Sequence, residues 1–191
     1  MRYRLALYIS RIAHPINLLV AFVIYTLFSI LEPAKATWTV VGILLLGILP
    51  LIIWNRYHTQ KGRYSNFDVS IRRQRYSLYP WILFLGGLVI LFLWVNELPN
   101  EVLTGGLILI QLLLLSFLLN FRIKVSLHLA IAGYVALAIS PISFGLGVLL
   151  FVTLPLIAWS RWQLGRHRSA ELVWGASLGL ICGVQLLLLT P

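Results

Sequence analysis

The chain has 191 residues, of which 60% are hydrophobic and 10% are charged, and its formal net charge is +10. About a quarter of the residues in a soluble domain are charged, so this composition excludes an ordinary soluble domain and predicts an integral membrane protein. The basic residues form short clusters between apolar runs, which excludes a nucleic-acid-binding domain and predicts membrane lipids as neighbours.

Residues 1–13 alternate arginine with Leu, Tyr and Ile, a pattern that favours a helix lying in the membrane interface. Residues 14–191 then form a single polytopic membrane domain, because apolar runs follow one another with one long polar insert at residues 56–80. A spanning helix needs about 20 mostly apolar residues. We therefore predict an all-α integral membrane protein, a bundle of six to seven transmembrane helices. The predicted spans are residues 16–31, 38–54, 81–95, 102–120, 126–139, 144–159 and 170–189.

Charge is distributed unequally between the two sides of this bundle. With seven spans, every Lys and Arg residue except Lys35 falls on one side, whereas Glu97 and Glu101 fall on the other. Cytoplasmic connections of membrane proteins carry the excess of Lys and Arg. The sequence therefore predicts a multi-pass cell-membrane protein with a cytoplasmic N-terminus, an outside C-terminus and a cytoplasmic basic side.

Three connections on the basic side carry polar residues suited to phosphate chemistry. They are Asp68 with Arg72-Arg73-Gln74-Arg75, then Lys124-Val125-Ser126-Leu127-His128, and then Ser160-Arg161, five residues, His167 and, four positions later, Glu171. Because seven spans place all three connections on one side, we expect them to converge.

The residue types in these connections suit the binding of a phosphoryl group. Such a group carries negative charge on its equatorial oxygens and is stabilised by fixed cations and N–H donors. Arg161, Arg72 and Arg75 offer forked donors, and Lys124 offers a point charge. Ser126 stands where a helix begins, and a helix start favours an anion.

The third connection resembles a motif of the type 2 phosphatidic acid phosphatase superfamily of membrane lipid phosphatases. That motif reads Ser-Arg, five residues, His, three residues, Asp. Ser160, Arg161 and His167 match it, and Glu171 stands in the place of the aspartate.

The other two family motifs are matched less closely. The second motif, Pro-Ser-Gly-His, is matched by Val125-Ser126-Leu127-His128, and as in the family one helix separates the helix of this motif from that of the third. The first motif, Lys, six residues, Arg-Pro, is absent as written, and we take residues 72–75 as its degenerate counterpart. The resemblance covers residues 68–171 and implies a type 2 phosphatidic acid phosphatase core over about residues 68–189.

The resemblance implies a role for each matched residue. His167 is expected to attack phosphorus and form a phosphohistidine, and His128 to act as the general acid for the leaving alcohol. Glu171 is expected to share a helical face with His167 and to accept its other ring N–H. The expected phosphate-binding residues are Arg161, Arg72, Arg75, Lys124, Ser126 and Ser160.

The few acidic residues argue against a metal mechanism. The chain has five carboxylates, and no aspartate-rich pair exists to hold Mg²⁺. We therefore expect no metal and no cofactor. Asp68 is expected to form an ion pair with Arg72, and His14 and His58, which have no partner nearby in the sequence, are assigned structural roles.

Two functions remain open at this point. The first is metal-independent hydrolysis of a lipid phosphate or prenyl diphosphate at the membrane interface, and the retention of both His128 and His167 favours it. The alternative is a catalytically silent membrane protein that binds phosphorylated lipids or acts as a scaffold, favoured by Glu171 and the degenerate first motif. The sequence carries no signal for an oligomeric state.

Overall fold

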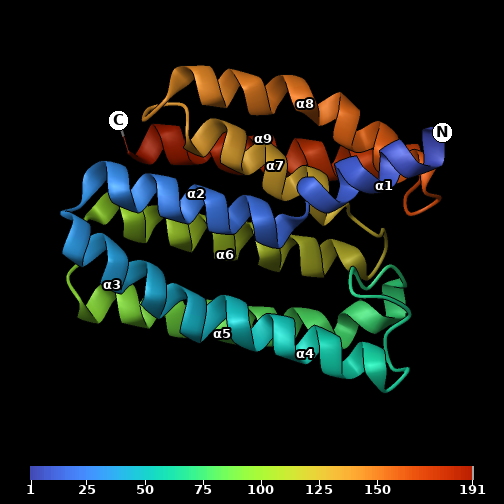
Figure 1. Cartoon of the computed structure of the whole chain (residues 1–191), viewed down its shortest axis with the longest axis horizontal. Coiled ribbons are helices and arrows are strands. Elements are labelled where there is room, and N and C mark those ends of the chain that lie inside the picture. The colour runs from blue at the N-terminus through green and yellow to red at the C-terminus, as the bar shows by residue number, and fades with distance from the viewer. Residues whose placement is uncertain (191) are drawn as a thin grey trace.

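The computed structural model describes residues 1–190, and within this range the chain is helical with no β-strand. The long helices run alternately in opposite directions along the longest axis, so that α1 begins at one end of the molecule and α9 finishes at the other (Figure 1). In chain order the elements are α1 (Arg2–Ile12), α2 (Pro15–Ile30), α3 (Pro33–Ile43), the π-helical turn η1 (Leu44–Ile48), α4 (Leu49–Gln60), the 3-10 turn η2 (Arg72–Gln74), α5 (Arg75–Val95), α6 (Asn100–Asn120), α7 (Leu127–Ala138), α8 (Phe144–Gln163) and α9 (Ser169–Leu189).

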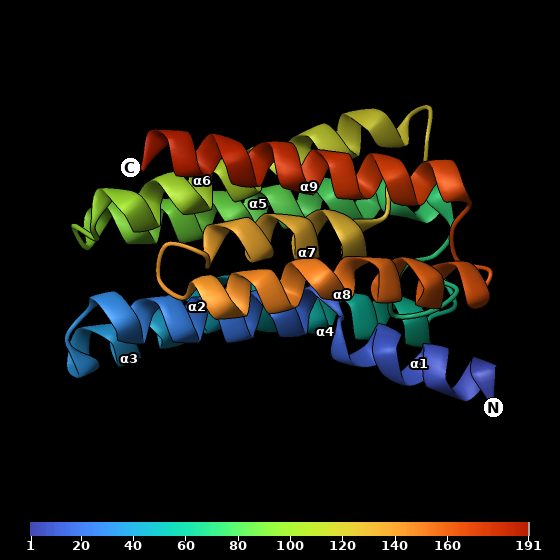
Figure 2. The ribbon, with the colours of Figure 1, turned by 90° about the horizontal axis from the view of Figure 1, so that it is seen from above.

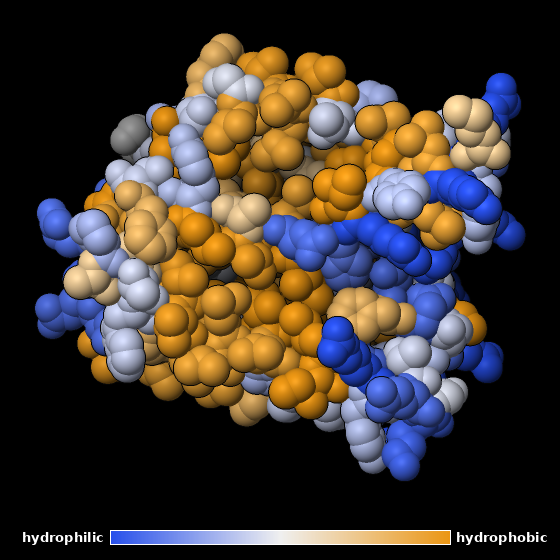
Figure 3. Space-filling view, viewed as in Figure 1, coloured by the Kyte–Doolittle hydropathy of each residue, from blue (hydrophilic) through white to orange (hydrophobic). Residues whose placement is uncertain are grey.

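The prediction of an all-helical chain with long apolar helices is confirmed. Within residues 1–190, five helices are long and apolar enough to cross a membrane, and α1 with α2, which meet at a bend of 41°, make a sixth if the pair is counted as one span. On the face shown in Figure 3, hydrophobic side chains cover most of the middle, while hydrophilic ones stand at both ends and are more numerous at the end where α1 begins. This distribution fits a protein whose middle lies in lipid.

Several helices extend beyond the predicted spans into polar sequence. The predicted span 38–54 is part of a continuous 28-residue helix, Pro33–Gln60. Helix α5 begins at Arg75 rather than at residue 81 and contains Pro80 in its interior. Helix α8 continues to Gln163, so that Ser160 and Arg161 lie within the helix rather than in the connection that follows. Apolar run length therefore marks the middle of each helix but not its ends.

Helix α7 is short and lies inside the bundle between α8 and α9 (Figure 2). With 12 residues it is about 18 Å long, less than the hydrocarbon thickness of about 30 Å. Gly175, Gly179 and Gly183 form a stripe along α9 that allows close packing on α7: a Cβ at Gly179 would lie 2.1 Å from the carbonyl oxygen of Ala130. The close packing fixes the start of α7, which carries His128, against the start of α9.

The three polar connections lie together at the end of the molecule where α1 begins (Figure 1). The ammonium group of Lys124 donates to the carbonyl oxygen of Ser70 at 3.3 Å and to that of Arg166 at 2.6 Å. One side chain thus joins all three connections, and the predicted convergence is confirmed.

Helix α1 adds an element to this end of the molecule. It packs along α8, with Ala6 and Ser10 buried, and it ends at Ile12, shortly before α2 begins at Pro15. His14 precedes α2, and its Nδ1 accepts a hydrogen bond from the N–H of Ile16 at 3.2 Å. The N-terminal segment therefore reaches the residues of the candidate site.

Candidate functional site

A hollow of about 1030 Å³ opens between the three connections, and we call it the basic hollow. Its lining includes His167 and Ser70, and Glu171 is its only carboxylate among the described residues. Five cationic residues also line it: Arg72, Arg122, Lys124, Arg166 and Arg168. The excess of positive charge attracts an anionic ligand.

His167 and Glu171 are in contact, as predicted, but they do not share a helical face. His167 lies before α9, Arg168 is the N-cap residue, and Glu171 is the third residue of the helix. The Glu171 carboxylate reaches back from the first helical turn, so that Oε2 lies 2.9 Å from Nδ1 of His167 and accepts the N–H of Arg168 at 3.2 Å. A capping interaction therefore holds the carboxylate that orients the histidine.

The surroundings of His167 keep its imidazole neutral at pH 7. Burial lowers the pKa of His167 well below its ordinary value, and the charges of Arg75 and Lys124 lower the pKa further. Because Glu171 acts as an acceptor toward both neighbours, Nδ1 of His167 carries the ring proton. In this tautomer Nε2 carries the lone pair, which is the form that a nucleophile requires, and the ring is buried beside the backbone of Lys124.

Lys124 is the central cation of the converging connections. Its ammonium group lies 3.7 Å from Oε2 of Glu171, in addition to its bonds to the two carbonyl oxygens. Burial lowers the pKa of Lys124, and the Glu171 charge acts in the opposite direction. Lys124 therefore holds the walls of the basic hollow together as well as adding to its charge.

The two predicted arginines of the first connection donate to backbone groups. Arg75 is buried and donates from Nε to the carbonyl oxygen of Val69 at 2.9 Å and from Nη1 to that of Val125 at 2.8 Å. Arg72 donates from Nη1 to the carbonyl oxygen of Arg122 at 2.8 Å. Arg72 lines the basic hollow, whereas Arg75 fastens the first connection to the second without lining it.

The predicted serines differ in the state of their hydroxyl groups. Ser160 is buried in α8 and donates to the carbonyl oxygen of Ile157 at 2.8 Å, so its proton is committed to its own helix. Ser126 is the N-cap residue of α7, but its hydroxyl makes no capping bond and has no hydrogen-bond partner within residues 1–190. Nε of Arg161 is buried without a partner as well. Buried polar atoms are normally paired, so these two groups have hydrogen-bonding capacity that the described residues leave unused.

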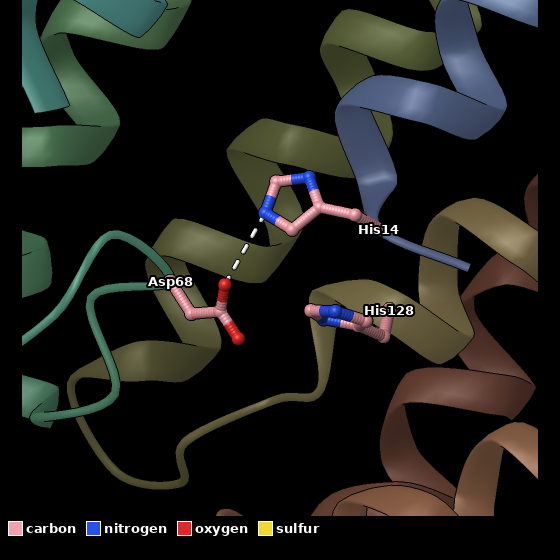
Figure 4. A group of neighbouring side chains, drawn as sticks. All are labelled: His14, Asp68 and His128. Carbon is pink, nitrogen blue, oxygen red and sulfur yellow. Dashed lines mark ion pairs between the residues drawn. The ribbon is translucent and has the colours of Figure 1, made fainter. Parts of the chain in front are cut away.

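A second group of side chains, the Asp68 cluster, consists of Asp68, His14, His128, Arg161 and Arg166. Oδ1 of Asp68 lies 3.3 Å from Nε2 of His14 (Figure 4), and Oδ2 accepts from Arg161 at 3.0 Å and from Arg166 at 3.2 Å. Nη1 of Arg161 also lies 3.4 Å from Nε2 of His128.

These contacts correct two predictions. Asp68 pairs with Arg161 and Arg166 instead of Arg72, and His14 belongs to the cluster although the sequence around it offers no partner. The partner of His14 lies 54 positions further along the chain, so only the fold reveals the contact. His58, by contrast, stacks between Trp54 and Tyr64, in keeping with the structural role assigned to it.

The Asp68 carboxylate is ionised in this cluster. Burial alone raises the pKa of Asp68, but the hydrogen bond from His14 and the charge of Arg161 lower it to below its ordinary range. Potential metal-ligand atoms of His14, Asp68 and His128 lie within 4.8 Å of one another. Arg161 already places a cationic nitrogen beside two of these groups, so a divalent cation would meet strong repulsion there. The contacts fit a carboxylate that balances arginine charge.

The structure thus places six of the predicted site residues in two groups, and Arg75, Ser126 and Ser160 in neither. His167, Glu171, Lys124 and Arg72 line the basic hollow, whereas His128 and Arg161 belong to the Asp68 cluster. Arg166 belongs to both. Comparisons of the chain with family models, with curated proteins and with solved structures found no match, so the resemblance to the phosphatase superfamily rests on the motifs themselves.

Proposed function

We propose that this chain hydrolyses a lipid phosphate or prenyl diphosphate at the membrane interface, without a metal ion, through a phosphohistidine on His167. The contact between His167 and Glu171 carries the proposal. With Nδ1 bonded to Glu171, the neutral imidazole carries its lone pair on Nε2, and His167 is among the residues that line a hollow rich in cations, an arrangement that suits attack on a phosphoryl group.

The proposed reaction has two displacements at phosphorus. In the first, Nε2 of His167 forms a bond to phosphorus, the bond from phosphorus to the leaving oxygen breaks, and His128 donates a proton to that oxygen. In the second, water attacks the phosphohistidine, His128 takes a proton from the water, and the P–N bond breaks to release phosphate. The cationic residues of the basic hollow stabilise the charge on the equatorial oxygens in both steps.

The start of α7 supplies further groups for an anion. The backbone N–H groups in the first turn of a helix lack partners inside that helix and favour negative charge. Here that turn begins at Ser126, whose buried hydroxyl has no partner, and it carries His128. The free Nε of Arg161 adds a charged donor. These groups would add hydrogen-bond donors for a phosphate that reaches the start of α7.

A silent phospholipid-binding protein is the second candidate. All three predicted phosphate-binding arginines already have partners: Arg72 and Arg75 donate to backbone carbonyls, and Arg161 pairs with Asp68. Such contacts would serve a binding protein or a scaffold as well as an enzyme. Turnover separates the two candidates.

The purified protein should release inorganic phosphate from lipid phosphates or prenyl diphosphates in detergent. The proposed mechanism uses no metal ion, so the rate should be the same with and without EDTA. Vanadate should inhibit, because it adopts the five-coordinate geometry of phosphorus under attack. Binding of the same lipids without phosphate release would support the silent alternative, and an EDTA-sensitive rate would contradict the proposed mechanism.

We further propose that the chain crosses the membrane seven times, with α7 as a short crossing and the basic end in the cytoplasm. The alternating helix directions support this topology (Figure 1), and the positive-inside rule supports its orientation. A membrane-impermeant maleimide added to intact cells should label cysteine placed at Asn100 but not at Arg63, Arg122 or Arg166. The unaltered chain is the control, since its Cys182 is buried. Labelling at Arg122 without labelling at Asn100 would reverse the orientation.

A further inference from the structure

His128 stands among several charged groups at the start of α7. Arg161 from α8 lies 3.4 Å from its Nε2, and the ring of His14 from the start of α2 meets its ring edge-on at a centroid distance of 5.4 Å. Asp68 lies close to it on the connection before α5. His167, on the connection before α9, makes a smaller electrostatic contribution. Arg166 reaches the same region through its bond to Asp68.

These charges create a difficulty for a general acid. To donate a proton, His128 must first hold one, and the resulting imidazolium would stand beside the guanidinium of Arg161. Like charges at this distance disfavour the protonated form. Some negative charge must therefore offset the arginines if His128 is to act as an acid.

Asp68 is the carboxylate placed to do this. Glu171 is engaged by His167, Lys124 and the N–H of Arg168. The other three acidic residues, Glu32, Glu97 and Glu101, stand beside or within the helix connections at the opposite end of the bundle (Figure 1). Asp68 alone has an oxygen bonded to Arg161 and lies close to His128.

We propose that Asp68 is the counter-ion that allows His128 to carry the proton it gives to the leaving alcohol, and that His14 holds Asp68 in position. The inference rests on the proposed phosphatase function and adds two positioning residues to it. Asp68 and His14 would thus support the acid as Glu171 supports the nucleophile.

The orientation of His14 follows from its position before α2. Its Nδ1 accepts the N–H of Ile16 at 3.2 Å and therefore carries a lone pair. In the neutral ring the proton must then be on Nε2, which donates it to Oδ1 of Asp68 at 3.3 Å (Figure 4). The helix cap thus selects the tautomer that holds the carboxylate, and Phe67 packs against the ring at a centroid distance of 5.6 Å.

The proton balance of the first displacement shows where the counter-ion acts. Before it, Asp68 is negative and His128 is protonated. As the P–O bond breaks, the proton moves from His128 to the leaving oxygen, which departs as a neutral alcohol, and His128 becomes neutral. Asp68 keeps its charge throughout and is not itself a proton donor.

The inference is tested by the leaving-group dependence of Asp68→Asn. With dioctanoyl phosphatidic acid, whose alkoxide needs a proton, kcat/KM should fall about 10²-fold, and with p-nitrophenyl phosphate, whose phenolate leaves without one, less than about 10-fold. The alkaline limb of the pH profile should move at least about one unit lower, because the imidazolium loses its counter-charge. Asp68→Glu should recover part of both effects.

The ratio of the two rates is independent of how much of the variant is folded, so partial unfolding leaves the test intact. Glu101→Gln is the matched control, since it removes an equivalent carboxylate at the opposite end of the bundle. An equal fall in kcat/KM on both substrates, with an unchanged pH profile, would show that Asp68 has only a structural role. A rise in activity would show that Asp68 competes with the substrate for Arg161. A rate that rises with added Zn²⁺ would assign the cluster to a metal. Each of these results overturns the inference.

His14→Asn separates the two bonds of His14. Asparagine can still accept the N–H of Ile16, because it is a favoured N-cap residue, but it is too short to hold Asp68 as histidine does. The variant should show the leaving-group and pH effects of Asp68→Asn at smaller size, and wild-type behaviour would contradict the role of His14. If the unaltered protein hydrolyses neither substrate, or hydrolyses them without His167, the proposed function fails as well. A His167-dependent enzyme that tolerates Asp68→Asn disproves only the inference.

Discussion

Replacing His167 by alanine should abolish phosphate release, with a loss of about 10⁴- to 10⁶-fold in kcat, as expected for removal of a nucleophile. The physical reason is that, with Nδ1 bonded to Glu171, Nε2 of the neutral ring is the nitrogen that carries the lone pair. Rapid alkaline quenching of the wild-type protein with a ³²P-labelled lipid phosphate should trap labelled phosphohistidine. The variant should carry no label.

His58→Ala is a suitable control for this experiment. His58 is buried at the same end of the molecule, but it stacks on Trp54 at a ring-centroid distance of 4.2 Å and takes no part in the basic hollow or the Asp68 cluster. The variant should lose stability and still form the phosphoenzyme. Label that persists in His167→Ala would place the nucleophile elsewhere and would remove the basis of the proposed function.

The helices could be predicted from apolar runs, but the residues at which they end and the burial of α7 inside the bundle could not. A run of apolar residues indicates which part of a helix meets lipid, and each predicted span falls within a helix or extends only slightly past its ends. Helix ends depend instead on tertiary hydrogen bonds, such as those that hold Arg75 inside the fold and let α5 begin before the apolar run. The burial of α7 depends on the glycine stripe of α9, whose partner lies in another part of the sequence.

The candidate site could be predicted in part because its motifs encode local geometry. The spacing of His167 and Glu171 places them in contact, although by way of a helix cap rather than a helical face. Contacts between distant segments could not be read in the same way. His14 and Asp68 meet only because α1 and α2 bring the N-terminal segment against the first connection. The commitment of the Ser160 hydroxyl to its own helix likewise depends on where α8 ends.

Arg161→Lys should lower kcat/KM by at least about 10²-fold even though the charge is kept. Arg161 is almost fully buried, with 1% exposure. A single nitrogen, Nη1, contacts Ser10 at 2.6 Å, Asp68 at 3.0 Å and His128 at 3.4 Å. Its Nε remains without a partner within residues 1–190, and under the proposed function it would donate to phosphate. A lysine ammonium is a single point and cannot hold Asp68 and a phosphate in a fixed fork. Steady-state assays with dioctanoyl phosphatidic acid would measure the loss.

Arg63→Lys makes the same chemical change at an exposed position at the same end of the molecule and should leave the rate unaltered. Because Arg161 also pairs with Asp68, its replacement by lysine should disturb the counter-ion as well as the phosphate. The loss should therefore be larger with dioctanoyl phosphatidic acid than with p-nitrophenyl phosphate, and vanadate inhibition should weaken for both substrates. Wild-type turnover in Arg161→Lys would show that a positive charge at this position is sufficient and that the guanidinium geometry does not contribute to catalysis.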